Sequence, residues 1–193
     1  MIRNATRALM ATIVLAVLTG LVYPLVMTGL AQVAFHDRAN GSLVNVDGTA
    51  VGSSLIGQQW EGPEWFYGRP SAANYDAAAS SGSNLGPRSR ALADAIKERV
   101  AAILKVEGPY HPGLRAADIP VDLLTASASG LDPDISPAAA LFQTARIAAV
   151  RHLSRARVQR LIQENTEGKV LGVLGEPRVN VFELNLALRR LEG

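Results

Sequence analysis

The longest apolar stretch of the chain lies near its start. Residues 8–35 contain no charged side chain, and the group His36-Asp37-Arg38 follows at once. Roughly 20 apolar residues in a helix cross the hydrocarbon core of a bilayer. A cleaved signal peptide is the alternative, but its apolar region has only about 7–15 residues, and Gly29-Leu30-Ala31 is a poor cleavage site. The pattern therefore predicts an uncleaved transmembrane helix over residues 8–35.

Small residues and a proline recur at every fourth position of this segment. On a helix this spacing traces one slowly drifting face. Small side chains let membrane helices approach closely, and threonines can hydrogen-bond across the contact. Chance is the alternative, because alanine, threonine and glycine are common throughout the chain. We interpret the stripe as a face that docks on other membrane helices, formed by Thr12, Ala16, Gly20, Pro24 and Thr28.

Shorter periodic segments follow the span. Asp47-Gly48 lies between two β-prone runs, residues 43–46 and 54–57, which is a hairpin signal. Residues 60–87 show no sustained period and are rich in aromatic residues, glycine, serine and asparagine. A loop of this length in a compact domain is usually functional or disordered. The aromatic residues favour a functional loop.

The second half of the chain mixes helical and strand signals. Ser136-Pro137 predicts a helix start, with serine as the N-cap and proline at the first helical position, and Ser154 is a second N-cap. Without a repeating βαβ pattern, these elements predict one α+β domain over residues 36–193. The pattern predicts helices over residues 87–106, 138–152, 155–163 and 184–188, and strands over residues 121–125, 170–174 and 179–182.

The charges predict an orientation. Arg3 and Arg7 account for the whole formal net charge of +2, so residues 36–193 carry no net charge. The positive-inside rule places residues 1–7 in the cytoplasm of a single-pass protein of the bacterial inner (plasma) membrane. Residues 36–193 then form an extracytoplasmic, periplasmic domain. Nucleic-acid binding needs a clustered basic surface, whereas the arginines of residues 151–160 and 189–190 indicate a solvated helix face.

The sequence predicts no catalytic residue and no metal ligand. It has no phosphate-binding loop motif and no serine nucleophile elbow, and its three histidines lack the spacing of zinc ligands. Asp132-Pro133-Asp134 suits either an acid/base pair or half of a cation site, or simply a turn that stabilises the next helix. Ser127 and Ser129 lie nearby without an obvious general base.

Six short blocks behind the apolar span resemble a known family, in the same order. They are GSSLIGQ (52–58), FYGRPS (66–71), GSNLG (82–86), TASASGLD (125–132), ISPAAA (135–140) and NVFELNLAL (180–188). The chain resembles the KdpC family, the small single-span subunits of the bacterial Kdp potassium-importing ATPase. The departures are minor: Ala128 stands where some members carry glycine, and Asp134 occupies a variable position.

The resemblance implies a division of labour among subunits. A potassium-channel-like subunit and a P-type ATPase subunit would be the partners, and they would handle potassium and ATP, so no tightly bound cofactor is expected here. The small subunit is implied to stabilise the complex and to act as a catalytic chaperone that raises the pump subunit's affinity for ATP. A glutamine linked to that effect falls on Gln143. An ordinary helix-surface or capping amide is the alternative for this residue.

Two other hypotheses remain open from the residues. The chain is alternatively a membrane-anchored binding module, in which the loops of residues 60–87 and 125–137 capture a ligand or gate the pump entrance. The candidate loop residues are Arg69, Ser71, Ser83, Asn84, Ser127, Ser129 and Asp132. An anchored hydrolase that uses Ser127 or Ser129 is the third. An effect on ATP would have to cross the membrane through packed helices, because the charges place Gln143 outside.

Overall fold

A computed structural model of the chain describes residues 2–191. The chain divides into two compact units, one ending at Ser53 and the other beginning at Ser54. This division reflects contacts within the chain and does not locate a membrane. The predicted boundaries of the membrane span, after residue 7 and after residue 35, therefore stay predictions. The predicted fold class is confirmed, because the structure mixes helices and strands behind one N-terminal apolar helix.

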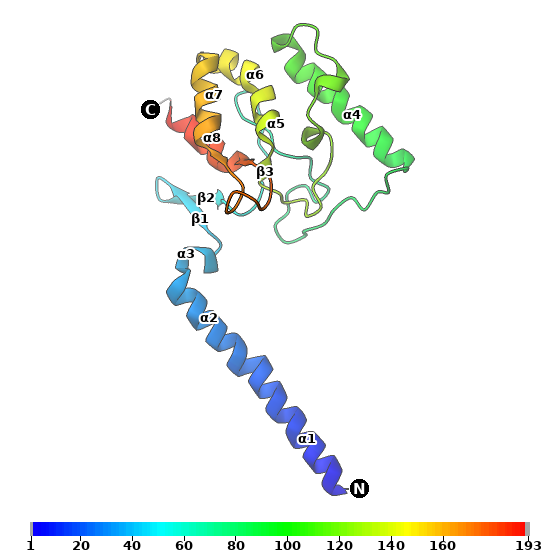
Figure 1. Cartoon of the computed structure of the whole chain (residues 1–193), viewed down its shortest axis with the longest axis vertical. Coiled ribbons are helices and arrows are strands. Elements are labelled where there is room, and N and C mark those ends of the chain that lie inside the picture. The colour runs from blue at the N-terminus through cyan, green and yellow to red at the C-terminus, as the bar shows by residue number, and fades with distance from the viewer. Residues whose placement is uncertain (1, 192–193) are drawn as a thin grey trace. The chain divides into compact units, whose positions relative to one another are not determined.

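The first unit begins with one long apolar helix. Residues 2–34 run as α1 (Ile2–Val17), a π-helical segment (Leu18–Val22) and α2 (Tyr23–Ala34), with a mean hydropathy of 2.3 over the most apolar window and no buried residue. The helix is long and apolar enough to cross a membrane. It begins several residues before the predicted span (Figure 1).

The π-helical segment lies directly before Pro24. Proline has no N–H to donate, and its ring crowds the carbonyl four residues earlier, which belongs to Gly20. At Tyr23 the N–H donates to Leu18 O, five residues back. The wider turn therefore re-spaces the hydrogen bonds where an α-helix would meet the proline.

A short helix and a hairpin complete the first unit. They are α3 (His36–Ala39), β1 (Leu43–Val46) and β2 (Thr49–Ser53), with β1 and β2 antiparallel. Asp47 and Gly48 both have positive φ, 52° and 79°, as a two-residue hairpin turn of type I′ requires. The predicted turn is confirmed, but the second strand directly follows it instead of starting at Ser54.

The second unit combines a small sheet with four helices that pack on one another (Figure 1). The antiparallel strands β3 (Asp134–Ile135), β5 (Arg178–Asn180) and β4 (Thr166–Glu167) lie in that order. The helices are α5 (Pro137–Phe142), α6 (Thr144–Val150), α7 (Arg155–Glu164) and α8 (Val181–Arg190), and α4 (Arg90–Glu107) lies at the edge of the same unit. Short 3-10 turns span Gly108–Tyr110, Ala116–Asp118 and Val121–Leu123.

The core of this unit is mainly aliphatic and includes an aromatic residue from the long loop. Ile135, Ile147, Val179 and Leu184 are buried, and Phe66 of the irregular 60–87 segment is fully buried beside them. The segment contains no helix or strand among its described residues, yet it passes through the core. Its backbone therefore needs hydrogen-bond partners from side chains.

Several sequence-based predictions are confirmed or corrected. Ser136 and Ser154 cap α5 and α7, because each hydroxyl accepts the backbone N–H three residues on. The predicted strand over residues 121–125 is instead a 3-10 turn over Val121–Leu123, since Leu123 and Leu124 pack into the core without a pairing partner. The predicted helix over 138–152 is two helices that break at Gln143, and the 170–174 strand is a tight loop with one bridge between Val170 and Leu174.

Candidate functional site

A buried polar cluster holds the irregular segment against the helices. Asn185 on α8 is fully buried, and its side chain pairs with both backbone groups of Phe66. The Nδ2 group donates to Phe66 O at 3.0 Å, and Oδ1 accepts the Phe66 N–H at 2.9 Å. One amide side chain thus provides the pair of hydrogen bonds that a neighbouring strand would give.

Gln143 performs the same task for the next residue. It lies at the break between α5 and α6 with 1% of its surface exposed. Its Oε1 accepts the Tyr67 N–H at 2.8 Å, and its Nε2 donates to Tyr67 O at 3.1 Å and to Ala139 O at 3.3 Å. A glutamine amide offers two donors and two acceptor lone pairs. The helix-surface alternative for Gln143 is therefore wrong, whereas the capping alternative is confirmed in part, because Gln143 is the C-cap residue of α5 and its Nε2 donates to Ala139 O.

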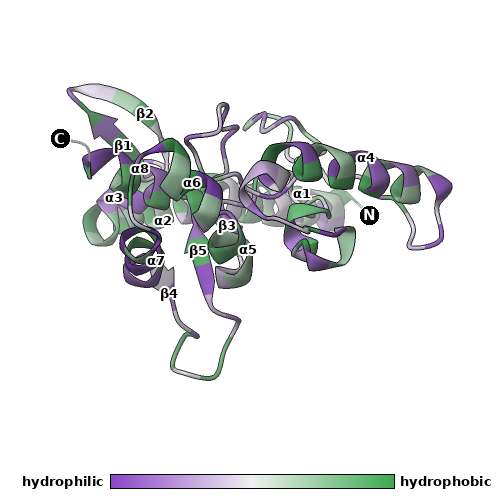
Figure 2. Cartoon of the chain, turned by 90° about the horizontal axis from the view of Figure 1, so that it is seen from above, coloured by the Kyte–Doolittle hydropathy of each residue, from purple (hydrophilic) through white to green (hydrophobic). Residues whose placement is uncertain are grey.

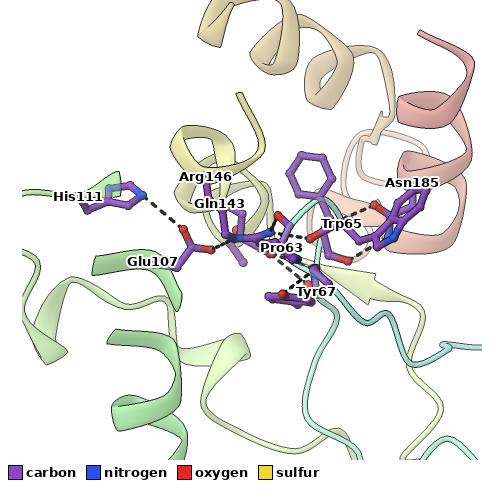
Figure 3. A network of polar contacts seen from close by, with 11 residues as sticks. Pro63, Trp65, Tyr67, Glu107, His111, Gln143, Arg146 and Asn185 are labelled. Carbon is purple, nitrogen blue, oxygen red and sulfur yellow. Dashed lines mark hydrogen bonds and ion pairs between the residues drawn. The ribbon is translucent and has the colours of Figure 1, made fainter. Parts of the chain in front are cut away.

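Arg146 completes the cluster from one turn further along (Figure 3). Its Nη2 donates to Gln143 Oε1 at 2.8 Å, which fills the second acceptor position of that amide. Its Nη1 donates to the carbonyl oxygens of Pro63 and Trp65, the latter at 2.9 Å. The guanidinium also lies over the Tyr67 ring, 4.4 Å from the centroid, in a cation–π arrangement.

A buried carboxylate balances the charge of Arg146. Glu107, at the end of α4, accepts the Arg146 Nε–H at 2.7 Å, and both side chains are almost completely buried. Removing one partner of a buried ion pair costs about 3–5 kcal/mol, because the other charge stays desolvated. The second oxygen, Oε2, has no hydrogen-bond partner among the described residues, and His111 Nε2 lies 3.7 Å from it.

The pKa of Tyr67 is shifted by its burial and by the charges of these neighbours. Burial raises the pKa of its hydroxyl above the usual 10.0, and the Arg146 guanidinium acts in the opposite direction. The hydroxyl donates to Gly62 O at 2.8 Å, so its proton remains engaged within the segment.

We name Gln143, Arg146, Glu107 and Asn185 the segment clamp, because together they fix residues 63–67.

A cavity of about 170 Å³ adjoins the segment clamp. Its wall is mainly apolar and combines one face of α4 with Phe142 and the edges of Tyr67, Glu107 and Gln143. A space of this size and character accepts a small apolar group rather than a nucleotide. Among the described residues, no group of three or more His, Cys, Asp or Glu side chains could hold a metal ion.

The two predicted functional loops meet in the structure. Arg69 Nη1 forms an ion pair with Asp132 Oδ2 at 3.0 Å, and Ser71 Oγ donates to Gly130 O at 2.6 Å. The backbone of Ser127 donates to Pro70 O, and Ser129 O accepts the Ser80 hydroxyl. Five of the seven candidate loop residues therefore lie together.

Most polar groups of this junction are used in holding it. Asp132 also accepts the Asp134 N–H, and Ser129 Oγ accepts the Leu131 N–H, which supports the turn interpretation of Asp132-Pro133-Asp134. Asp134 is paired with Arg178 at 3.1 Å. Burial raises the pKa of the Asp134 carboxyl above its usual 3.8, and Arg178 opposes the change. Ser83 and Asn84 are exposed and join none of these contacts.

Sequence reasoning missed three members of the segment clamp. Glu107, Arg146 and Asn185 each stand among apolar helix positions that face the core. A polar residue in such a position is a recognisable signal, because a buried polar group needs a partner. The identity of that partner was hidden, since the 63–67 segment has no periodicity of its own.

Known proteins resemble this chain over nearly its full length. The profile of one family, described as "K+-transporting ATPase, c chain" (KdpC), matches residues 5–190. The potassium-transporting ATPase KdpC subunit of Herpetosiphon aurantiacus is 54% identical over 188 residues, which cover 96% of this chain and 95% of that protein. The KdpC subunit of Koribacter versatilis is 49% identical, with coverage of 96% and 94%. That of Bradyrhizobium diazoefficiens is 50% identical, with coverage of 98% for both chains.

Proposed function

The chain belongs to the KdpC family of potassium-transporting ATPase subunits, and we propose that it stabilises this complex and raises the ATP affinity of its pump subunit without catalysing a reaction itself. The partners are other Kdp subunits. In our proposal they are the potassium-channel-like subunit and the P-type ATPase subunit, which handle potassium and ATP.

The segment clamp is the observation that carries this proposal. Its amide and guanidinium groups are turned inward to the chain's own backbone, at Phe66, Tyr67, Pro63 and Trp65. An apparatus of this kind gives one defined shape to a surface that otherwise lacks regular structure. A non-catalytic subunit that acts by contacting its partners needs such a surface of fixed shape.

Gln143 acts, in this proposal, through the shape of the unit. All its hydrogen-bonding positions serve Tyr67, Ala139 and Arg146, so it holds the segment in place instead of contacting a nucleotide. The effect on ATP then reaches the pump subunit through contacts between subunits. We also propose the orientation given by Arg3 and Arg7, with the N-terminus in the cytoplasm and the larger unit outside.

The test compares two clamp residues from different helices. We expect Gln143→Leu and Asn185→Leu each to raise the KM for ATP of the purified complex several-fold, with kcat little changed, because both loosen the same segment. Gln163→Leu, at an exposed amide of α7, serves as the control. A raised KM in the Gln143 variant alone would indicate a direct role, and an unchanged KM in both would refute the proposal.

A second candidate function follows from the meeting of the two loops. A membrane-anchored binding module would use the junction of residues 69–71 with 127–132 to capture a ligand or to gate the pump entrance. Potassium prefers oxygen ligands such as carbonyl groups, and serine hydroxyls and carbonyls are concentrated here. Calorimetry of the full chain in detergent tests this function. A heat of binding for potassium that exceeds the heat for sodium would favour it, and equal heats for the two ions would refute it.

A further inference from the structure

The loop between β4 and β5 carries four exposed aliphatic side chains. We name residues 169–176 the apolar loop. Val170, Leu171, Val173 and Leu174 are 54%, 87%, 75% and 59% exposed. Figure 2 shows this loop extending away from β4 and β5 with a hydrophobic tip. Contiguous exposed apolar residues of this kind mark interaction sites on soluble surfaces.

The apolar loop is ordered by its own hydrogen bonds. The backbone groups of Val170 and Leu174 bond to each other in both directions, at 2.9 and 3.0 Å. Lys169 Nζ pairs with Glu176 Oε1 at 3.2 Å across the base. The exposed side chains are therefore presented by a defined turn.

Leu171 stands at a position that does not suit leucine. Its φ is 53°, and Gly172 follows with 76°. Asparagine or glycine is the usual choice for such a turn, because a branched side chain is strained in the left-handed region. With 87% of its surface exposed, Leu171 gains nothing from burial within its own unit. The stability of the unit thus does not explain this residue.

We propose that the apolar loop inserts into an apolar socket on another subunit of the potassium-transporting ATPase. Val170 and Leu174 are bonded to each other across the turn, and Leu171 and Val173 lie between them. A pocket lined by aliphatic or aromatic residues fits such a turn. This inference rests on the part of the proposed function that concerns complex stability. It does not depend on the effect on ATP affinity.

The charges around the apolar loop favour a protein partner over lipid. Lys169 is paired with Glu176, and Arg178 is paired with Asp134 and Glu167. Residues 165–180 contain no aromatic side chain. Segments that dock on anionic bilayers usually present unpaired basic residues and interfacial tryptophan or tyrosine. A neutral, purely aliphatic tip matches a dry protein pocket better.

The first experiment uses the absence of cysteine from the chain. A single Leu171→Cys substitution is labelled with the environment-sensitive dye NBD. The full chain is measured alone in nanodiscs of phosphatidylethanolamine and phosphatidylglycerol, and then within the assembled complex. We expect water-like emission in the nanodisc and blue-shifted, brighter emission in the complex. Val121→Cys, at another exposed aliphatic position, should change little.

Two outcomes of the dye experiment overturn the inference. Blue-shifted emission in the nanodisc without partners would show that lipid covers the loop. Water-like emission in both samples would show that nothing covers it. Failure of the unsubstituted chain to assemble with the other subunits would instead refute the proposed function itself, so the two failures are distinguishable.

The second experiment separates docking from folding. Leu171→Asn replaces leucine with a residue that tolerates positive φ, so the thermal midpoint of the full chain should stay the same or rise. Dissociation of the variant subunit from the purified complex should become about tenfold faster or more, as expected for loss of a central anchor. Val121→Asn is the matched control. Equal dissociation rates for Leu171→Asn and the unsubstituted chain would overturn the inference.

Discussion

At the scale of single residues, two amides and one arginine replace a missing strand. The side chains of Asn185 and Gln143 form hydrogen bonds with the backbone of Phe66 and Tyr67. Arg146 donates to two further carbonyl oxygens of residues 63–67. Phe66 is thereby bound to α8, and the next residue, Tyr67, is bound to the junction of α5 and α6. Paired buried polar groups rigidify a structure, and here Glu107 Oε2 is the clamp atom that lacks a hydrogen-bond partner among the described residues.

Gln143→Leu removes the amide and leaves the backbone of Tyr67 buried without partners. Each buried group without a hydrogen bond costs about 1–3 kcal/mol, so for the N–H and C=O of Tyr67 together we expect the free energy of unfolding to fall by about 2–6 kcal/mol. Urea unfolding of the full chain in detergent measures this loss. Gln163→Leu, at an exposed site, should stay within about 0.5 kcal/mol of the unsubstituted chain.

Asp134→Asn tests the electrostatics at the edge of the sheet. Because burial raises the pKa of Asp134 in the folded chain above 3.8, folding favours its protonated form. Its contribution to stability is complete below the unfolded-state pKa and is lost as the pH rises through the folded-state pKa. The variant should therefore gain stability relative to the unsubstituted chain as the pH rises from about 3 to about 7. Thermal unfolding across this range detects it, and a constant difference would contradict it.

At the scale of elements, the N-terminal helix combines a small-residue stripe with a π-helical turn. A stripe that repeats every four residues drifts around a helix with 3.6 residues per turn. The π-helical segment at Leu18–Val22 winds more slowly, so it offsets part of that drift. Thr12, Ala16, Gly20, Pro24 and Thr28 are thus better aligned than in an uninterrupted α-helix.

Gly20→Leu tests whether this stripe packs on other helices. A Cβ at Gly20 meets nothing within 4 Å in the chain itself, so the helix should tolerate leucine. Close approach of a partner helix should be blocked, and co-purification of the other subunits should fall. Val26→Leu enlarges a residue off the stripe and is the control. Unchanged recovery of all subunits with Gly20→Leu would rule out the packing face.

The junction of the two loops depends on a close backbone approach at Gly130. This residue has a φ of 67°, and a Cβ there would lie 2.6 Å from Ser81 O and 2.8 Å from the Ala73 Cβ. Gly113 has a φ of 80° but open space around it. Comparing alanine at both positions separates backbone strain from steric clash.

We expect Gly113→Ala to cost about 1 kcal/mol of unfolding free energy, from the strained φ alone. Gly130→Ala should cost about 1–3 kcal/mol more, because the loops must move apart. Denaturant midpoints of the two variants measure the difference. Equal losses would mean that the loops are not tightly joined at this point.

At the scale of the whole molecule, periodic elements were predictable and the clamp was not. The apolar span, the Asp47-Gly48 turn and the Ser136 and Ser154 caps follow local rules that operate within a few residues. The break at Gln143, the 3-10 turn at 121–123 and the path of residues 63–67 depend on contacts between distant parts of the chain. Helical periodicity even concealed the break, because residues on both sides of Gln143 face the same core.

The candidate site shows the same division. Arg69, Ser71, Ser127, Ser129 and Asp132 were selected by composition and do lie together. Their contacts are mainly with each other, which composition cannot reveal. Gln143 was selected only by family resemblance, and its burial became clear only from the packing of α5 and α6 against the segment.

The most direct test of the account is purification of the complex from native membranes through a C-terminal tag on this chain. We predict that a multi-span membrane protein and a P-type ATPase elute with it, and that the eluate shows potassium-stimulated ATP hydrolysis. Elution of the chain alone, without ATPase activity, would contradict its role as a stabilising subunit.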